Sequence, residues 1–218
     1  MSTVLIVLDG WGYREQEHGN AVAMARTPHY DALESRADTS LILTHGKAVG
    51  LPKEQCGNSE VGHLTLGAGR PIPHPRVEIT EKLETSLASG TVDKDLEQLL
   101  DCKGIVHLVG VHSKGGVHGL DYVTYLWCDF FLKYTQNTIY LHVITDGRDQ
   151  PYGDWPELYR ETSQRLESYR GRVVIASLSG RFFAMDRDTN WDRTQKFVDA
   201  LLGRVRQGED LYQVSLDS

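Results

Sequence analysis

The stretch with the strongest chemical character runs from Cys56 to Arg70 and reads CGNSEVGHLTLGAGR. A single serine, Ser59, stands there among four glycines, and glycine lets a backbone turn tightly and come close to a ligand. A serine followed by glutamate and then by apolar residues is also typical of the start of a helix, where free backbone N–H groups attract anions. Val61 occupies the place of the second glycine in the G-x-S-x-G elbow of serine hydrolases, so that motif is excluded. Two interpretations of Ser59 remain open at this point, a reactive hydroxyl and a simple helix cap.

A second set of chemically capable side chains follows three apolar runs at 105–111, 138–144 and 173–178. The set contains histidines, carboxylates and arginines: His112, His118, Asp146, Arg148, Asp149, Arg181 and Arg187. Because the carboxyl ends of parallel strands meet at one edge of a sheet, we expect these residues to converge. Guanidinium groups match the oxygens of phosphate and carboxylate, so the pattern predicts a pocket for a small dianion. Arg193, on a predicted helix, is interpreted instead as a member of a surface ion pair.

Two short apolar runs precede the serine stretch. Thr3–Leu8 is apolar on both faces, which is typical of a strand buried in a parallel sheet, and it ends at Asp9. Ligands bind beyond the carboxyl ends of such strands, so Asp9 is either a ligand-binding residue or part of a turn. A second strand is predicted at Ser40–Thr44, and a Thr-Pro pair predicts the start of a helix over 28–37.

Prolines alternate in the segment RPIPHPR, at positions 71, 73 and 75. This spacing favours stiff, extended chain, so we predict a domain boundary at 71–76. Beyond it, predicted helices alternate with the three apolar runs; they lie near 77–88, 92–101, 120–134, 155–169 and 190–206. The alternation of strand and helix predicts an α/β fold with a mainly parallel sheet.

The composition of the 218 residues is ordinary for a globular protein, with 40% hydrophobic and 24% charged residues. A net charge of −7 argues against general nucleic-acid binding, which needs a basic face. The three cysteines, Cys56, Cys102 and Cys128, show no C-x-x-C spacing, which favours a reducing compartment over a disulfide scaffold or a zinc ribbon. No signal peptide and no apolar run of membrane-spanning length is found. We therefore expect a cytoplasmic protein with neither nucleic acid nor a membrane as its partner.

Taken together, several motifs resemble those of one enzyme family. They are LIVLDGWG, GLPKEQCGNSEVGH with LGAGR, SKGGVH, TDGRD and SGRFFAMDRDTNWDR. This is the cofactor-independent (2,3-bisphosphoglycerate-independent) phosphoglycerate mutase family of the alkaline phosphatase superfamily. The resemblance runs over nearly the whole chain. It implies that residues 1–70 are part of a phosphatase-like domain that carries the nucleophilic serine. Residues 71–76 would then form a hinge, and 77–218 would form an inserted, incomplete α/β domain that binds substrate.

The resemblance also implies roles for individual residues. Ser59 would be the nucleophile that becomes phosphoserine, and Asp9 and Ser59 would ligate one of two manganese ions. The matching substrate-binding residues are His118, Arg148, Asp149, Arg181 and Arg187. Among these, His118 and Asp149 would also bind or shuttle protons at the glycerate hydroxyls. The implied reaction converts 3-phosphoglycerate to 2-phosphoglycerate in glycolysis and gluconeogenesis.

The sequence departs from the pattern of this family at several points. The chain is less than half as long as the family's chains, and the remaining metal ligands of that family have no counterpart here; there is no Asp-His dipeptide. Gly119 stands where the family usually has serine, and PIPHPR replaces the family's usual sequence after GAGR. Asp9 and Ser59 alone are too few ligands for a dinuclear site, so we expect little mutase activity from this polypeptide by itself. The first seventy residues form a marginal core, so they should expose apolar sheet edge unless a complementary half or a second copy covers it.

Three interpretations of the chain therefore remain. It is an N-terminal portion of a mutase, as a fragment or as one half of a split enzyme. Alternatively, it is a short relative that binds a phosphorylated small molecule or a protein without doing chemistry. A different hydrolase or phosphotransferase of the superfamily fits less well, because SKGGVH, DGRD and MDRD match the mutases closely.

Overall fold

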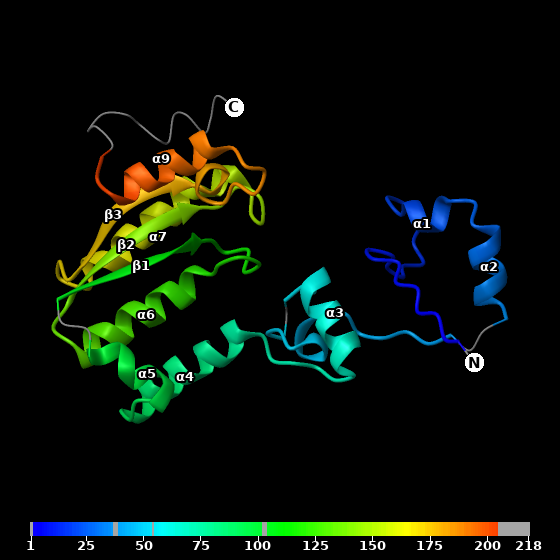
Figure 1. The fold of residues 1–218 in the computed structure, drawn as a ribbon, viewed down its shortest axis with the longest axis horizontal. Helices are drawn as coiled ribbons and strands as arrows, with labels where there is room; N and C mark the ends of the chain where they lie inside the picture. Colours follow the sequence, from blue (N-terminus) through cyan, green and yellow to red (C-terminus); the bar gives the residue numbers. More distant parts are fainter. Residues whose placement is uncertain (1, 37–38, 54, 102–103, 205–218) are drawn as a thin grey trace. The chain divides into compact units, whose positions relative to one another are not determined.

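The structure is a computed structural model that describes residues 2–36, 39–53, 55–101 and 104–204 (Figure 1). The chain divides into two compact units, Met1–Glu78 and Ile79–Ser218, which are described separately below. No helix within the described residues is long and apolar enough to cross a membrane. Of the three cysteines, Cys102 lies outside the described residues. Cys56 is an exposed free thiol, and Cys128 is a buried free thiol.

The first unit contains short helices and connecting segments. These are α1 (Ala21–Met24), α2 (Pro28–Glu34), the 3-10 helix η1 (Gly46–Val49) and α3 (Ser59–Ala68). Helix α2 begins at the predicted proline, because a proline at the first position has no N–H that needs an intrahelical partner. The helix ends earlier than predicted, and position 37 lies outside the described residues. A small core of Val49, Leu51 and Val61 joins η1 to α3.

The two strands predicted in this unit, Thr3–Leu8 and Ser40–Thr44, were wrong. Neither segment is a strand, and no strand occurs among the described residues of the unit. A strand needs a neighbour for its backbone N–H and C=O groups, and here neither run finds one. Their apolar side chains are consequently exposed, with 76–79% exposure from Val4 to Ile6 and 67–74% from Leu41 to Leu43. The expected exposure of apolar surface is thus present, but not as the edge of a sheet.

The proline-rich segment 71–76 belongs partly to a helix. Helix α4 (Pro75–Ser89) starts two residues earlier than predicted, with proline at its first position. Ahead of it, the N–H of His74 donates to the carbonyl of Gly50 at 2.8 Å, so the segment contacts the end of η1. A hinge at 71–76 stays a prediction.

The second unit is an α/β fold with a parallel sheet, as predicted. Its strands are β1 (Ile105–His112), β2 (Thr138–Thr145) and β3 (Val173–Gly180), in the order β1-β2-β3. Its helices after α4 are α5 (Lys94–Glu97), η2 (Gln98–Asp101), α6 (Asp121–Tyr134), η3 (Tyr152–Asp154), α7 (Trp155–Glu167), α8 (Arg181–Ala184) and α9 (Trp191–Leu201). The predicted helix 92–101 is divided into α5 and η2, and the last two residues of the predicted helix 190–206 lie outside the described residues.

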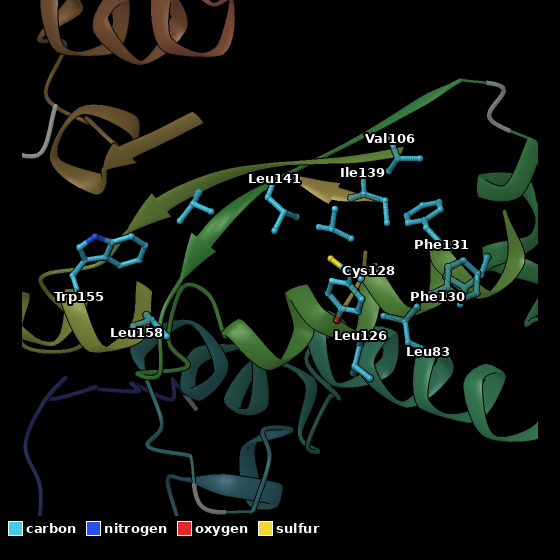
Figure 2. Close-up of a cluster of buried hydrophobic side chains, with 14 residues drawn as sticks. Leu83, Val106, Leu126, Cys128, Phe130, Phe131, Ile139, Leu141, Trp155 and Leu158 are labelled. Carbon is cyan, nitrogen blue, oxygen red and sulfur yellow. The ribbon is translucent and has the colours of Figure 1, made fainter. Parts of the chain in front are cut away.

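The core of the second unit lies between one face of the sheet and helices α4, α6 and α7 (Figure 2). Side chains alternate across a strand, so every second residue of each strand faces these helices. Ile139 and Leu141 of β2 are at most 1% exposed, and Phe130 of α6 is fully buried. Helix α6 packs near β1 and α9 packs near β3 (Figure 1). This core fixes the carboxyl ends of the three strands, from which the predicted site residues follow.

Candidate functional site

Ser59 is the first residue of helix α3 and is exposed. The helix cap is the residue before it: the side chain of Asn58 accepts a hydrogen bond from the N–H of Val61 at 3.2 Å. The interpretation of Ser59 as a simple cap was therefore wrong, because asparagine already satisfies that position. The serine hydroxyl is left available for other contacts.

The hydroxyl of Ser59 lies between a carboxylate and an imidazole. It donates to Oδ2 of Asp9 at 2.8 Å, and His63 Nδ1 lies 3.2 Å from Ser59 Oγ. His63 Nδ1 also lies 2.7 Å from the carbonyl oxygen of Ser59. A carbonyl can only accept, so this nitrogen must carry the hydrogen and donate. Asp9 is therefore the acceptor for the serine proton, and the one hydrogen of His63 Nδ1 goes to the carbonyl of Ser59 and not to Oγ.

The sequence interpretation did not include His63. The available signal is its spacing: residues four apart lie on the same face of a helix, which brings His63 over Ser59. The hydrogen bond between Asp9 and Ser59, fifty positions apart in sequence, brings together the two residues that the resemblance assigned to one metal ion.

Asp9 and Ser59 offer two oxygen ligands, the donor type that suits manganese and magnesium. No group of three or more His, Cys, Asp or Glu side chains placed to hold a metal ion occurs among the described residues. The donor chemistry thus fits part of a metal site, and the described residues do not complete one.

Asp146, just after β2, is the buried centre of the second unit's site. Its side chain is fully buried and accepts hydrogen bonds from Ser113 Oγ at 2.7 Å and from the backbone N–H groups of Arg148 and Asp149 at 3.0 and 3.1 Å. Arg181 Nη1 donates to it at 2.9 Å. Burial by itself would raise the pKa of Asp146, but these hydrogen bonds outweigh it and hold the pKa below its ordinary value. Asp146 is therefore ionised, and its carboxylate holds the loop after β2 in place.

Asp149, His118 and Arg181 form one hydrogen-bonded cluster at the carboxyl ends of the strands. Asp149 Oδ2 lies 2.6 Å from His118 Nδ1 and 2.7 Å from Arg181 Nη1. Burial would raise the pKa of Asp149, but the hydrogen bonds from His118 and Arg181 outweigh this effect. The pKa is therefore below its ordinary value, and the carboxylate stays ionised. An ionised carboxylate only accepts, so His118 Nδ1 carries the hydrogen of this bond. Burial lowers the pKa of Arg181, but its bonds to the two carboxylates outweigh this and raise it.

Arg148 and Arg187 differ from Arg181. Both side chains are exposed, and neither has a side-chain hydrogen bond or ion pair within the described part of the chain. The Arg187 loop is fixed by Asp186, which accepts from the N–H and Nδ2 of Asn190, both at 2.8 Å. Arg193 pairs with Asp186 at 3.3 Å, so the predicted ion pair is present, but the Asp186 side chain is only 3% exposed and the pair is not on the helix surface. Two uncommitted guanidinium groups are thus available to bind an anion.

The structure brings together three of the predicted substrate-binding residues, His118, Asp149 and Arg181. The backbone N–H of Arg148 joins them through Asp146, whereas no hydrogen bond or ion pair among the described residues links Arg187 to this cluster. His112, by contrast, is 1% exposed and hydrogen-bonds to Thr162, which is not a member of the cluster. The structural roles of Ser113 and Asp146 were not assigned from sequence, because no local pattern shows which carboxylate a buried hydroxyl will meet.

Gly119 follows His118 where the backbone passes close to β1. A Cβ added there would lie 2.0 Å from the carbonyl oxygen of Val111, which is far inside van der Waals contact. We expect Gly119→Ala to destabilise the second unit by about 2 kcal/mol and to shift the NMR resonances of His118. Urea unfolding would measure the loss.

A matched control is Gly153→Ala, because a Cβ at Gly153 meets nothing within 4 Å. Equal stability of the two variants, with unmoved His118 resonances, would show that the backbone at position 119 has room for a side chain.

Comparison with known proteins places the chain in a family. Residues 83–215 match the family model described as the BPG-independent PGAM N-terminus. A 2,3-bisphosphoglycerate-independent phosphoglycerate mutase from Gloeobacter violaceus is 44% identical over 200 residues, covering 88% of this chain and 36% of the relative. The enzyme of the same name from Thermosynechococcus vestitus is 47% identical over 196 residues, again covering 88% and 36%. A Nostoc relative is 40% identical over 223 residues, covering 97% of this chain and 41% of the relative.

The chain also resembles a solved structure. A crystal structure of Leishmania mexicana phosphoglycerate mutase matches 83% of this chain and 34% of that chain, with a TM-score of 0.67 and 33% identity. The chain spans between 36% and 41% of the length of these curated relatives. It therefore belongs to the 2,3-bisphosphoglycerate-independent phosphoglycerate mutases, a metal-dependent family of isomerases, and corresponds to an N-terminal portion of its relatives.

Proposed function

We propose that this chain supplies the nucleophile and the substrate-binding residues of a phosphoglycerate mutase. The enzyme would interconvert 3-phosphoglycerate and 2-phosphoglycerate through phospho-Ser59, as a cytoplasmic step of glycolysis and gluconeogenesis. The observation that carries this proposal is the cluster in which Asp149 Oδ2 meets both His118 and Arg181. Arg148, the residue before Asp149, is exposed.

The arginines in the second unit divide into two roles. Arg181 already faces two carboxylates, so its charge is largely compensated and it holds Asp149 in place. Arg148 and Arg187 are exposed, so they supply the positive charge that binds the phosphate and the carboxylate of phosphoglycerate.

Asp149 and His118 would handle the hydroxyl groups of glycerate. The ionised Asp149 accepts a hydrogen bond from one hydroxyl and orients it. His118 holds its Nδ1 hydrogen on Asp149, and the neutral form of the ring would take a proton from a hydroxyl at Nε2 and return it. This assignment matches the roles that the resemblance implies.

In the first unit, Ser59 would accept the phosphoryl group. Its proton already points to Asp9. Asp9 and Ser59 would supply two of the ligands of one manganese ion in a two-ion site. The positive charge of a bound ion would lower the pKa of the serine hydroxyl. The other ligands would come from a complementary C-terminal half.

A second candidate function is binding of a phosphorylated small molecule without chemistry. The cluster around Asp149 is formed by one unit alone, whereas the described residues hold only a partial metal site. The exposed apolar residues 4–6 and 41–43 then suit contact with a protein partner or a second copy.

A hybrid protein separates the two functions. This chain would replace the matching N-terminal portion of the Gloeobacter violaceus relative, and conversion of 3- to 2-phosphoglycerate would be followed with manganese present. We expect a rate within about tenfold of the parent enzyme, because the chemistry-bearing residues would all be supplied. A folded hybrid that binds 3-phosphoglycerate but does not convert it would favour the binding function.

A further inference from the structure

Two turns carry the cluster around Asp149, and they are in direct contact. The turn after β1, residues 113–118, ends at His118, and the turn after β2, residues 146–150, contains Asp149. A Cβ added to Gly115 would lie 2.5 Å from the carbonyl oxygen of Asp149, which is closer than real Cβ atoms come to other atoms. The 2.6 Å contact between His118 Nδ1 and Asp149 Oδ2 therefore depends on how one turn lies against the other.

Gln150 reaches from the second turn to the first. Its Oε1 accepts a hydrogen bond from the backbone N–H of Lys114 at 2.6 Å. Ser113 Oγ lies 3.0 Å from the same oxygen, but a hydroxyl has one hydrogen, and the ionised carboxylate of Asp146 accepts it at 2.7 Å. The carboxamide of Gln150 is thus held by the backbone of the turn that carries His118.

Only one end of the Gln150 carboxamide has a partner. The side chain is 8% exposed, and its Nε2 has no hydrogen-bond partner among the described residues. The orientation of the amide is fixed, because Nε2 in the place of Oε1 would set two donors against each other at Lys114. A buried donor without a partner is unfavourable for stability. The contact made by Oε1 is therefore the one that gives this polar side chain a role.

The residue that Gln150 holds is itself anchored. The Nζ of Lys114 pairs with Asp121 at the start of α6 at 2.7 Å and with Glu161 of α7 at 2.9 Å. Ser113 adds a second link between the turns through its hydrogen bond to Asp146. Loss of the Gln150 contact should therefore loosen the first turn without unfolding the unit.

We propose that Gln150 is a positioning residue for the cluster around Asp149: its carboxamide oxygen holds the turn 113–118 so that His118 meets Asp149 in the geometry that binds phosphoglycerate. The identity of the ligand rests on the proposed function. Removal of one net hydrogen bond shifts the balance from the held turn to a loosened one by about tenfold at most. A ligand that needs the held turn loses affinity by up to the same factor.

Gln150→Met tests this role, because methionine has a similar length and volume and lacks the oxygen. In the ¹⁵N-labelled full chain without ligand, we expect the Lys114 N–H resonance to move upfield, to exchange faster with solvent, and the His118 imidazole resonances to shift. Titration with 3-phosphoglycerate should show affinity weakened by about fivefold. The matched control is Gln164→Met, an exposed position on α7, which should leave the resonances and the affinity unchanged.

A double-mutant cycle with His118→Ala separates positioning from a general loss of stability. If Gln150 acts by holding His118, Gln150→Met should weaken binding by less than about twofold once the imidazole is gone. A general loss of stability would weaken binding equally in both backgrounds. If circular dichroism shows that Gln150→Met is unfolded, Gln150→Asn takes its place, since its carboxamide is one methylene shorter and falls short of Lys114.

Unmoved His118 resonances in the Gln150 variant, or an unchanged affinity for 3-phosphoglycerate, would overturn the proposal. So would an equal loss of affinity with and without the His118 imidazole. If the unchanged chain does not bind 3-phosphoglycerate, the proposed function fails instead. The ligand-free His118 resonances then still decide whether Gln150 holds the turn.

Discussion

Ser59→Ala in the hybrid enzyme is expected to reduce conversion of 3- to 2-phosphoglycerate by about 10⁴-fold or more, which is the scale of losing a nucleophile. The structure gives the reason, because Ser59 Oγ is the atom between Asp9 and His63. Alanine removes this oxygen and leaves the cap at Asn58 in place, so α3 should persist. A coupled assay for 2-phosphoglycerate measures the loss, and mass spectrometry of the unchanged hybrid should find phosphate on Ser59.

Ser35→Ala is the matched control, since it removes an exposed helix-end hydroxyl in the same unit. Its rate should stay within about twofold, as for an ordinary surface substitution. If the Ser59→Ala hybrid retained its activity, the phosphoryl group would have to travel by another route and Ser59 would be structural.

Asp146→Ala is expected to destabilise the second unit by about 3–5 kcal/mol, the scale of breaking a buried charge pair. The carboxylate is fully buried and accepts from Ser113, from two backbone N–H groups and from Arg181. Its removal leaves these donors unsatisfied and leaves Arg181, only 14% exposed, with a single carboxylate. Urea unfolding of the two proteins at pH 7 gives the difference.

The same carboxylate makes stability depend on pH. The pKa of Asp146 is below its ordinary value of 3.8 in the folded chain, and the pKa of Asp149 is also lowered. A carboxylate with a lowered folded pKa contributes stability above its unfolded pKa, and this is lost as pH falls through the folded pKa. The unchanged chain should therefore lose stability below about pH 4, and Asp146→Ala should lose less over the same range. Parallel losses in both proteins would show that Asp146 is not the source.

The second unit could be predicted from sequence because its signals are local. Each apolar run is followed by a helix that returns the chain to the sheet, so β1, β2 and β3 find their partners within the unit. The runs at 3–8 and 40–44 carry the same signal, yet neither is a strand. An apolar run favours burial and strand pairing, but it forms a strand only where a neighbouring strand is available to pair with it.

The candidate site could be predicted in part. His118, Asp149 and Arg181 converge because strand ends converge, which the alternation of strands and helices indicates. Asp146 was not recognised as the centre of the site, because its role depends on hydrogen bonds that cross between loops. The tautomer of His63 follows only from the distance to a carbonyl oxygen.

The most direct measurement is a titration of the ¹⁵N-labelled chain with 3-phosphoglycerate, read at backbone and arginine side-chain resonances. We predict saturable shifts at His118, Arg148, Asp149, Arg181 and Arg187. Arg148→Gln should weaken binding by about tenfold or more, the scale of a charge-assisted hydrogen bond, whereas Arg160→Gln on the outer face of α7 should leave it unchanged. The absence of saturable shifts at these five residues, or equal affinities in both variants, would contradict the assignment of this cluster as the substrate site.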